Sequence, residues 1–139
     1  MSTNDPGNIA SSSRSDITIL TTSFPRFAGD NAGRFVYNFA YALSQSGCTV
    51  QVIAPDDSKV IPQSFPFTVK NFPYIFPRSL QSLAYGAGMA SRIKSNGWRL
   101  LQLPFFAMAF FFAALKSEGK ILHAYWTLAG LVALAVKFF

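Results

Sequence analysis

The first third of the chain alternates between strand and helix patterns. A short, uninterrupted β-branched run, ITILTT, begins at Ile17 and is typical of a strand buried on both faces of a parallel sheet. A helix is expected over about Gly33–Ser46, with Phe35 and Phe39 on its core-facing side and Gly47 just past its C-terminus. The segment CTVQVIAP is the next strand. This order predicts a right-handed βαβ unit with parallel strands.

The rest of the chain continues the same alternation. We expect a third strand around Phe67–Phe72, short helices within Leu80–Lys94, a helix over Leu100–Leu115, a strand at Lys120–His123 and a helix from Thr127. The predicted fold class is therefore α/β, a Rossmann-like open parallel sheet flanked by helices. Residues 1–15 are polar and aperiodic, which predicts a disordered tail before a domain at 16–139. Because the chain ends just after a helix begins to fold back, the domain is expected to be incomplete.

Apolar residues are abundant and charges are scarce. Hydrophobic residues make up 50% of the 139 residues and charged residues 13%, whereas an average soluble domain is about 25% charged. Leu100–Leu115 carries no charge, but it contains Gln102 and Pro104 and is shorter than the roughly 20 residues of a typical membrane span. We therefore expect a helix buried against the sheet, with a membrane span as the alternative.

Basic residues are concentrated in the middle of the chain. The net charge is +6, and Ser58–Ser117 holds seven basic residues, no acidic residue and nine of the fifteen phenylalanines. This composition indicates a surface that meets anionic lipid, phosphate or nucleic acid. The alternative is a solvated basic face over a phenylalanine-rich core. No nucleic-acid-binding motif is present, so nucleic acid is not an expected partner.

Single residues of three reactive types exclude several kinds of site. One cysteine, Cys48, excludes a disulfide framework, and one histidine, His123, excludes a standard zinc site, so no metal site is expected. Glu118 is the only glutamate, while Asp56 and Asp57 point apart in an extended chain; a glycosidase-type carboxylate pair is therefore not expected. The N-terminus has no apolar signal segment, which favours the cytoplasm.

Ligands of open parallel sheets bind outside the carboxyl ends of the strands. The loop at 23–32 leaves one such end, and Gly29 and Gly33 there precede a helix N-terminus whose free N–H groups suit a phosphate. Asp30 or Asn31 is the expected helix cap. The glycine spacing matches neither the dinucleotide fingerprint nor a P-loop. An ordinary glycine turn therefore remains the alternative interpretation.

A second loop, at 123–127, leaves the carboxyl end of the strand at Lys120–His123, and charged and aromatic residues in the two loops are further candidates. Arg26 and Asp30 lie in the first loop and are candidate ligand contacts, although Arg26 is equally interpreted as a solvated side chain. His123 stands where a strand should emerge at the top of the sheet, beside Tyr125 and Trp126. This position favours a functional role, whereas a lone histidine is more often a satisfied core residue.

Three segments of the chain resemble the N-terminal domain of family-4 glycosyltransferases. They are TSFPRFAGDNAGRFV at Thr22–Val36, AYALSQSGCTVQVIAP at Ala40–Pro55 and ILHAYWTLAGLVA at Ile121–Ala133. The resemblance runs from about Ile17 to the end of the chain. It implies half of a GT-B architecture, in which two Rossmann-like domains face each other across a cleft. The stretch PRSLQSLAYGAG and the following LLQLPFF look like members that act on membrane-linked or cell-surface acceptors.

What the resemblance implies is sugar transfer from a nucleotide-sugar to an acceptor with retention of configuration, and without a required metal or other cofactor. Gly29, Asp30 and Gly33 match the loop that approaches the donor phosphates. His123 matches the histidine that reaches the cleft near the transferred sugar. Tyr125 stands where many members have a second histidine, which is a departure from the family pattern.

A second departure concerns the donor. The family's donor-binding C-terminal domain carries two carboxylates in an E-x7-E motif, and a chain with one glutamate cannot contain it. We therefore expect a fragment that binds a glycan or lipid-linked acceptor, is inactive alone, and works in the cytoplasm or at the inner face of the membrane. The alternatives are a non-catalytic peripheral-membrane or acceptor-binding module and a different α/β nucleotide-binding enzyme.

Overall fold

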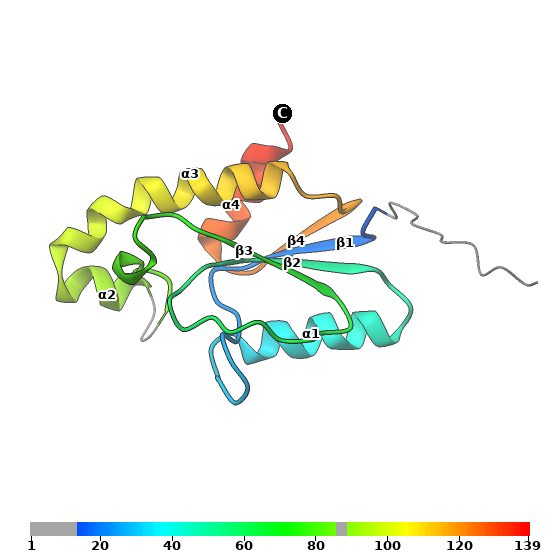
Figure 1. The fold of residues 1–139 in the computed structure, drawn as a ribbon. Coiled ribbons are helices and arrows are strands. Elements are labelled where there is room, and N and C mark those ends of the chain that lie inside the picture. Colours follow the sequence, from blue (N-terminus) through cyan, green and yellow to red (C-terminus); the bar gives the residue numbers. More distant parts are fainter. Residues whose placement is uncertain (1–13, 86–88) are drawn as a thin grey trace, which may run out of the picture.

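A four-stranded parallel sheet forms the centre of the molecule (Figure 1). The computed structural model describes residues 14–85 and 89–139. The strands are β1 (Ile17–Leu20), β2 (Val50–Pro55), β3 (Thr68–Phe72) and β4 (Ile121–Ala124). Their order is β3-β2-β1-β4, and every neighbouring pair is parallel. The predicted Rossmann-like α/β fold is thus confirmed.

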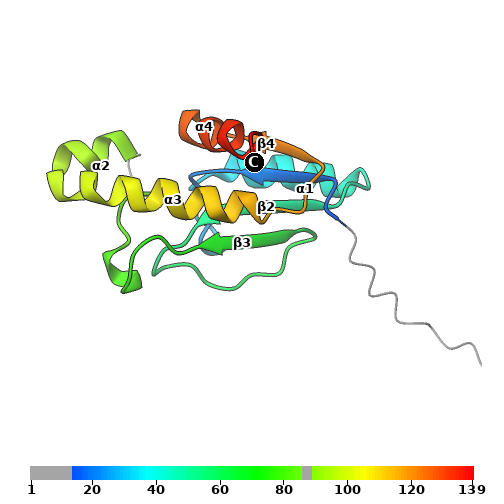
Figure 2. The same cartoon turned by 90° about the horizontal axis from the view of Figure 1, so that it is seen from above.

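Helices cover both faces of this sheet. One face carries α1 (Arg34–Gln45), and the opposite face carries α3 (Gln102–Leu115) and α4 (Thr127–Val136), as Figures 1 and 2 show. A shorter helix, α2 (Met89–Ser95), and a 3-10 turn at Gly97–Leu101 lead into α3. A further 3-10 turn lies at Arg78–Leu80.

The start of α1 differs from its prediction. Neither Asp30 nor Asn31 caps the helix; its N-cap residue is Gly33, in a left-handed conformation with φ 59°, and no side chain bonds to the first turn. The Asp30 carboxylate bonds within the preceding loop instead. The expected end is confirmed, since Gly47 has φ 91° just beyond the helix. A positive φ is the conformation that glycine adopts most readily.

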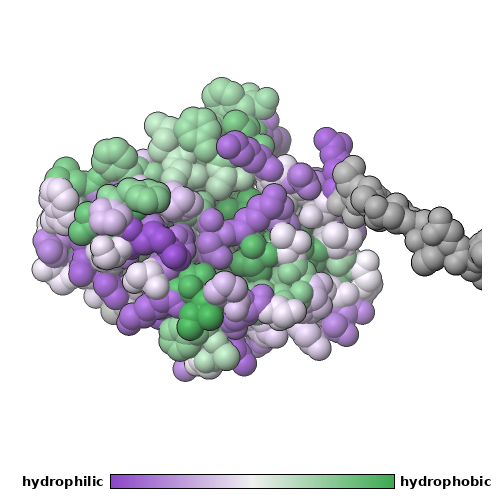
Figure 3. Space-filling view, viewed as in Figure 1, coloured by the Kyte–Doolittle hydropathy of each residue, from purple (hydrophilic) through white to green (hydrophobic). Residues whose placement is uncertain are grey.

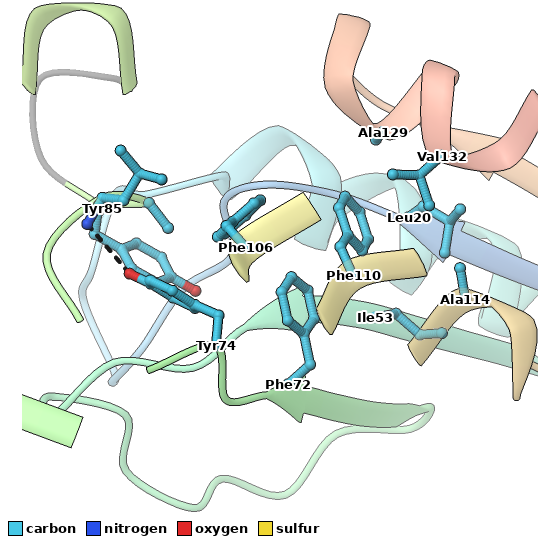
Figure 4. Packing of buried hydrophobic residues seen from close by; sticks show 12 residues of the cluster. Leu20, Ile53, Phe72, Tyr74, Tyr85, Phe106, Phe110, Ala114, Ala129 and Val132 are labelled. Carbon is cyan, nitrogen blue, oxygen red and sulfur yellow. Dashed lines mark hydrogen bonds between the residues drawn. The ribbon is translucent and has the colours of Figure 1, made fainter. Parts of the chain in front are cut away.

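Alternation along β1 divides the core into two clusters. Ile19 packs toward α1 with Val36 and Ala40, while Leu20 packs toward α3 and α4. Successive strand residues point to opposite faces, so a strand covered on both sides buries every position. Figure 4 shows the α3 side, where Phe110 stacks on Phe72 at 4.8 Å between ring centroids.

Helix α3 packs against the sheet as expected, but only one of its sides is buried. Phe106, Phe110 and Ala114 face the sheet and are fully buried, whereas Phe105 is 62% exposed. With the preceding turn, Gly97–Leu115 forms a helical segment of 19 residues that is long and apolar enough to cross a membrane by length and composition, and 22% of it is buried. A core helix of a soluble protein passes the same test.

The predicted tail lies almost entirely outside the described residues, as do residues 86–88 of the segment Leu80–Lys94, where short helices were expected. Ser15, the last residue of that tail, is buried. Its carbonyl accepts a hydrogen bond from the Lys120 backbone N–H at 3.1 Å. Ser15 therefore belongs to the folded domain.

Candidate functional site

The topology creates one preferred binding position. From β1 the chain moves outward to β2 and β3 on one side, and it later returns to place β4 on the other side of β1. The loops that leave β1 and β4 therefore diverge at the carboxyl ends of these neighbouring strands, which is a topological switch point. A backbone hydrogen bond of 2.9 Å from Tyr125 N–H to the Leu20 carbonyl joins the two strand ends.

An ion-pair clamp organises the loop after β1. The Asp30 carboxylate accepts hydrogen bonds from Arg26 Nε at 2.7 Å, from the Arg26 backbone N–H and from the Ala32 N–H. Burial acts to raise the pKa of Asp30, but these bonds outweigh it and lower the pKa to about 2. Arg26 also lies 3.6 Å from Asp57 and over the Tyr85 ring. The clamp thus ties this loop to the loop after β2, while a ligand-binding role for Arg26 and Asp30 stays a prediction.

Both predicted phosphate-loop glycines have a backbone reason to be glycine. Gly29 is the third residue of a four-residue turn, in which the Asp30 N–H donates to the Phe27 carbonyl at 3.1 Å. Its φ is 88°, and turns with a positive φ at the third position favour glycine there. Gly33 is buried, and a Cβ there would collide with the Ser23 carbonyl. Their role toward a phosphate stays a prediction.

A row of aromatic rings runs from α1 to the switch point. The His123 ring lies between Phe39, at 5.0 Å, and Tyr125, at 4.9 Å. Tyr125 contacts Phe35 at 5.3 Å, and Phe35 contacts Trp126 at 5.6 Å. His123 pairs in register with Ile19, so both side chains point toward α1. The sequence pattern placed Phe35 on the core side of the helix, but 47% of it is exposed.

Exposure increases along this row toward the strand ends. Phe39, His123 and Tyr125 are partly buried, and Trp126 is 56% exposed. Burial raises the pKa of Tyr125, so its hydroxyl is a neutral donor and acceptor at physiological pH. The predicted residues His123, Tyr125 and Trp126 are therefore brought together with Phe35. Their predicted ligand roles are not tested by this packing.

Trp126 has an unusual backbone conformation. Its φ of 76° and ψ of 156° lie in a region that is almost exclusive to glycine, and the residue immediately precedes α4. Such strain costs about 1–3 kcal/mol and clusters at functional sites. The sequence pattern does not predict this backbone conformation, because a tryptophan is an ordinary residue before a helix.

A pocket of about 630 Å³ lies between β3 and the loop after β2, and β3 is the edge strand opposite β4 in the sheet order. Its polar lining includes Asp56, Arg78 and Asn71, and Phe65 provides an apolar wall. Arg78 Nε and Nη2 each donate to Asp56 at 2.7 Å. No pattern in the sequence indicates this pocket, because irregular loop residues without motif spacing form most of it.

The two adjacent aspartates bind different arginines, as an extended chain favours. Asp56 pairs with Arg78, and Asp57 lies near Arg26. Across residues 14–85 and 89–139, no group of three or more histidine, cysteine or acidic side chains is arranged to hold a metal ion.

Comparison with known proteins identifies no relative. No family model matches the chain, and neither a curated protein nor a solved structure shows significant similarity to it. The family resemblance of its segments is therefore not supported by these comparisons. What the structure establishes is a small α/β domain with a parallel sheet of order β3-β2-β1-β4.

Proposed function

We propose that this domain is the acceptor-binding half of a retaining glycosyltransferase with two Rossmann-like domains. The observation that carries the proposal is the pair of exposed rings, Phe35 and Trp126, in contact at the switch point between β1 and β4. Open α/β sheets bind ligands at this position. The ring faces of aromatic side chains suit the apolar C–H face of a sugar.

Polar groups in the aromatic row and in the pocket beside β3 suit the hydroxyl groups of a sugar. The Tyr125 ring, which contacts Phe35 in the aromatic row, carries a hydroxyl group. The pocket beside β3, which β1 and β2 separate from β4, contains the Asn71 amide and the Asp56–Arg78 ion pair, which together supply donors and acceptors. In the proposal, the row holds the acceptor unit that reacts, and the pocket holds a further unit of the same acceptor.

Sugar transfer then requires a second, donor-binding domain as partner. The bond between the sugar and the nucleoside diphosphate breaks, a bond to the acceptor oxygen forms with retention, and the acceptor proton leaves with the departing diphosphate. Gly29, Asp30 and Gly33 are proposed to shape the loop that approaches those phosphates. His123 is proposed to act near the transferred sugar, and its contact with Tyr125 also positions that ring.

A binding titration tests the acceptor site. The chain has two tryptophans, so Trp98→Phe leaves Trp126 as the only indole. We expect its fluorescence to change in a saturable way with at least one of a panel of soluble methyl glycosides and short oligosaccharides. Phe35→Ala in the same background should weaken that binding about tenfold, the effect of one lost aromatic contact.

A matched control on the same helix is Tyr41→Ala. Tyr41 is 44% exposed, close to the 47% of Phe35, and stacks on Tyr37 away from the row. Its substitution should leave saccharide affinity unchanged. The acceptor proposal is wrong if no saccharide binds, or if both alanine variants weaken binding equally.

The isolated chain should not transfer sugar. Its only glutamate is Glu118, so the paired carboxylates of the donor domain are missing, and half a cleft cannot preorganise the diphosphate. Incubation with labelled nucleotide-sugars and the saccharides that bind should yield no labelled product. Turnover by the chain alone would contradict the proposed division of labour between two domains.

A further inference from the structure

The outer side of α3 presents a continuous apolar stripe. Its members recur at alternating steps of three and four residues and are each 42% to 62% exposed: Trp98, Leu101, Phe105, Met108, Phe112 and Leu115. This spacing places them on one side of a helix. Figure 3 shows apolar side chains gathered along the upper edge of the molecule, over α3 and the end of α4. Contiguous exposed apolar surface of this kind indicates a binding surface.

Basic side chains border the stripe. Phe112 lines a groove of about 420 Å³ between α3 and β3, and Lys70 and Lys116 line the same groove. Both lysines are exposed. At the other end, Arg99 follows Trp98 directly, and Lys94 is exposed on α2. No acidic residue occurs between Ser58 and Ser117, so the stripe and its border carry only positive charge.

The charge pattern selects the occupant of this surface. Pairing two copies of the stripe would bring Arg99 or Lys116 of one copy close to basic ends of the other, whichever way the helices run. With no carboxylate on the helix to compensate, such pairing is opposed by like-charge repulsion. An anionic lipid surface satisfies both features, because it accepts apolar side chains and attracts the lysines and arginines around them.

We propose that α3 lies in the plane of an anionic membrane, with the stripe inserted below the headgroups and Lys70 and Lys116 on lipid phosphates. Insertion across the bilayer is disfavoured because Phe106 and Phe110, on the other side of the same helix, are fully buried against the sheet. Spanning would strip the sheet of that cover. The proposal does not rest on the sugar-transfer function, since α3 and the aromatic row lie on opposite faces of the sheet.

Co-sedimentation of the full chain with vesicles tests the proposal. We expect binding to phosphatidylcholine vesicles containing about 30% phosphatidylglycerol, and much weaker binding to phosphatidylcholine alone. Raising NaCl from about 50 to about 500 mM should weaken the binding, because it screens the lysines and arginines. In Trp126→Phe, which leaves Trp98 as the only indole, brominated lipids should quench the fluorescence.

Two pairs of variants separate the apolar and basic contributions. Phe105→Ser with Met108→Ser should lower the partition coefficient about tenfold or more, whereas Tyr41→Ser with Ile61→Ser, which are also exposed but distant, should not. Lys70→Gln with Lys116→Gln should reduce the preference for anionic vesicles. The control, Arg34→Gln with Lys59→Gln, removes the same charge and should have a smaller effect.

Three outcomes would overturn the proposal. The first is absence of binding of the unmodified chain to anionic vesicles. The second is a dimer in light scattering that Phe105→Ser with Met108→Ser dissociates, without vesicle binding, since the stripe would then meet a second copy. The third is retention in the membrane after alkaline carbonate washing, which would indicate a spanning helix. None of these bears on saccharide binding, so this proposal and the proposed function fail separately.

Discussion

At Trp126, the glycine variant should be more stable than the alanine variant, which is the reverse of the usual order. The residue has φ 76° and ψ 156°, a conformation that glycine adopts readily and alanine does not. Both substitutions remove the ring contact with Phe35 at 5.6 Å. The two variants therefore share one loss and differ in the backbone freedom of the residue, which affects both the folded and the unfolded state.

The size of the difference follows from two opposing quantities. Strain at a residue in this region costs about 1–3 kcal/mol, and glycine relieves it. Glycine in turn loses more conformational freedom on folding, a cost of roughly 0.5–1 kcal/mol relative to alanine. With the middle of each range, the free energy of unfolding of Trp126→Gly should exceed that of Trp126→Ala by about 1 kcal/mol. In thermal unfolding this difference corresponds to about 3–5 °C.

Urea unfolding followed by far-ultraviolet circular dichroism measures this difference without using tryptophan fluorescence, which the substitution itself alters. Tyr41 provides the control, because it is exposed to 44% within α1. There the usual order applies, and Tyr41→Gly should be less stable than Tyr41→Ala by about 1 kcal/mol. If Trp126→Ala is as stable as Trp126→Gly, the strain at Trp126 is absent and the reasoning is refuted.

Three further predictions concern the loop after β1 and helix α3. Gly33→Ala should destabilise by about 3 kcal/mol or more, because its Cβ would meet backbone atoms, whereas Gly29→Ala, with open space, should cost about 1 kcal/mol; equal losses in urea unfolding would contradict this. Asp30, with its pKa lowered to about 2, contributes stability above its ordinary pKa that is lost as the pH falls from about 4 to 2. Asp30→Asn should therefore cost roughly 2 kcal/mol at pH 7 and progressively less in acid, and a constant difference would refute the assignment. Phe110→Ala should cost about 3–5 kcal/mol and Phe105→Ala under about 0.5 kcal/mol, and similar values would show that α3 has no buried side.

The sheet was predictable because local patterns specify it. The β-branched run at Ile17 and the alternation after Val50 allow little except buried strands, and Gly47 marks the end of the intervening helix. Strand order was less accessible, since parallel pairing depends on contacts between residues distant in the chain. The pairing of β1 with β4, for example, joins Ile19 to His123.

The site was only partly predictable, for a different reason. His123, Tyr125 and Trp126 were found because they follow a strand, and strand ends gather ligands. Phe35 was missed because helical periodicity assigns a phenylalanine to the core. The structure shows instead that its side chain, at the N-terminal end of α1 in the row of rings, is half-exposed. In the same way, an uncharged segment such as Leu100–Leu115 predicts burial but cannot reveal that one side of it stays uncovered.

Helix α4 links the two proposed surfaces without passing through the sheet. It begins directly after Trp126, and its Ala129 and Val132 pack in the same cluster as Phe106 and Phe110 of α3. The other links between the two sides pass through the strands of the sheet, whose opposite faces carry α1 and α3. Substitutions at Phe35 and Phe105 should therefore act additively in saccharide and vesicle binding. If vesicles do change the saccharide affinity, we expect this coupling to depend on α4. Val132→Ala should then reduce the change in saccharide affinity that vesicles cause, while saccharide binding and vesicle binding each remain measurable.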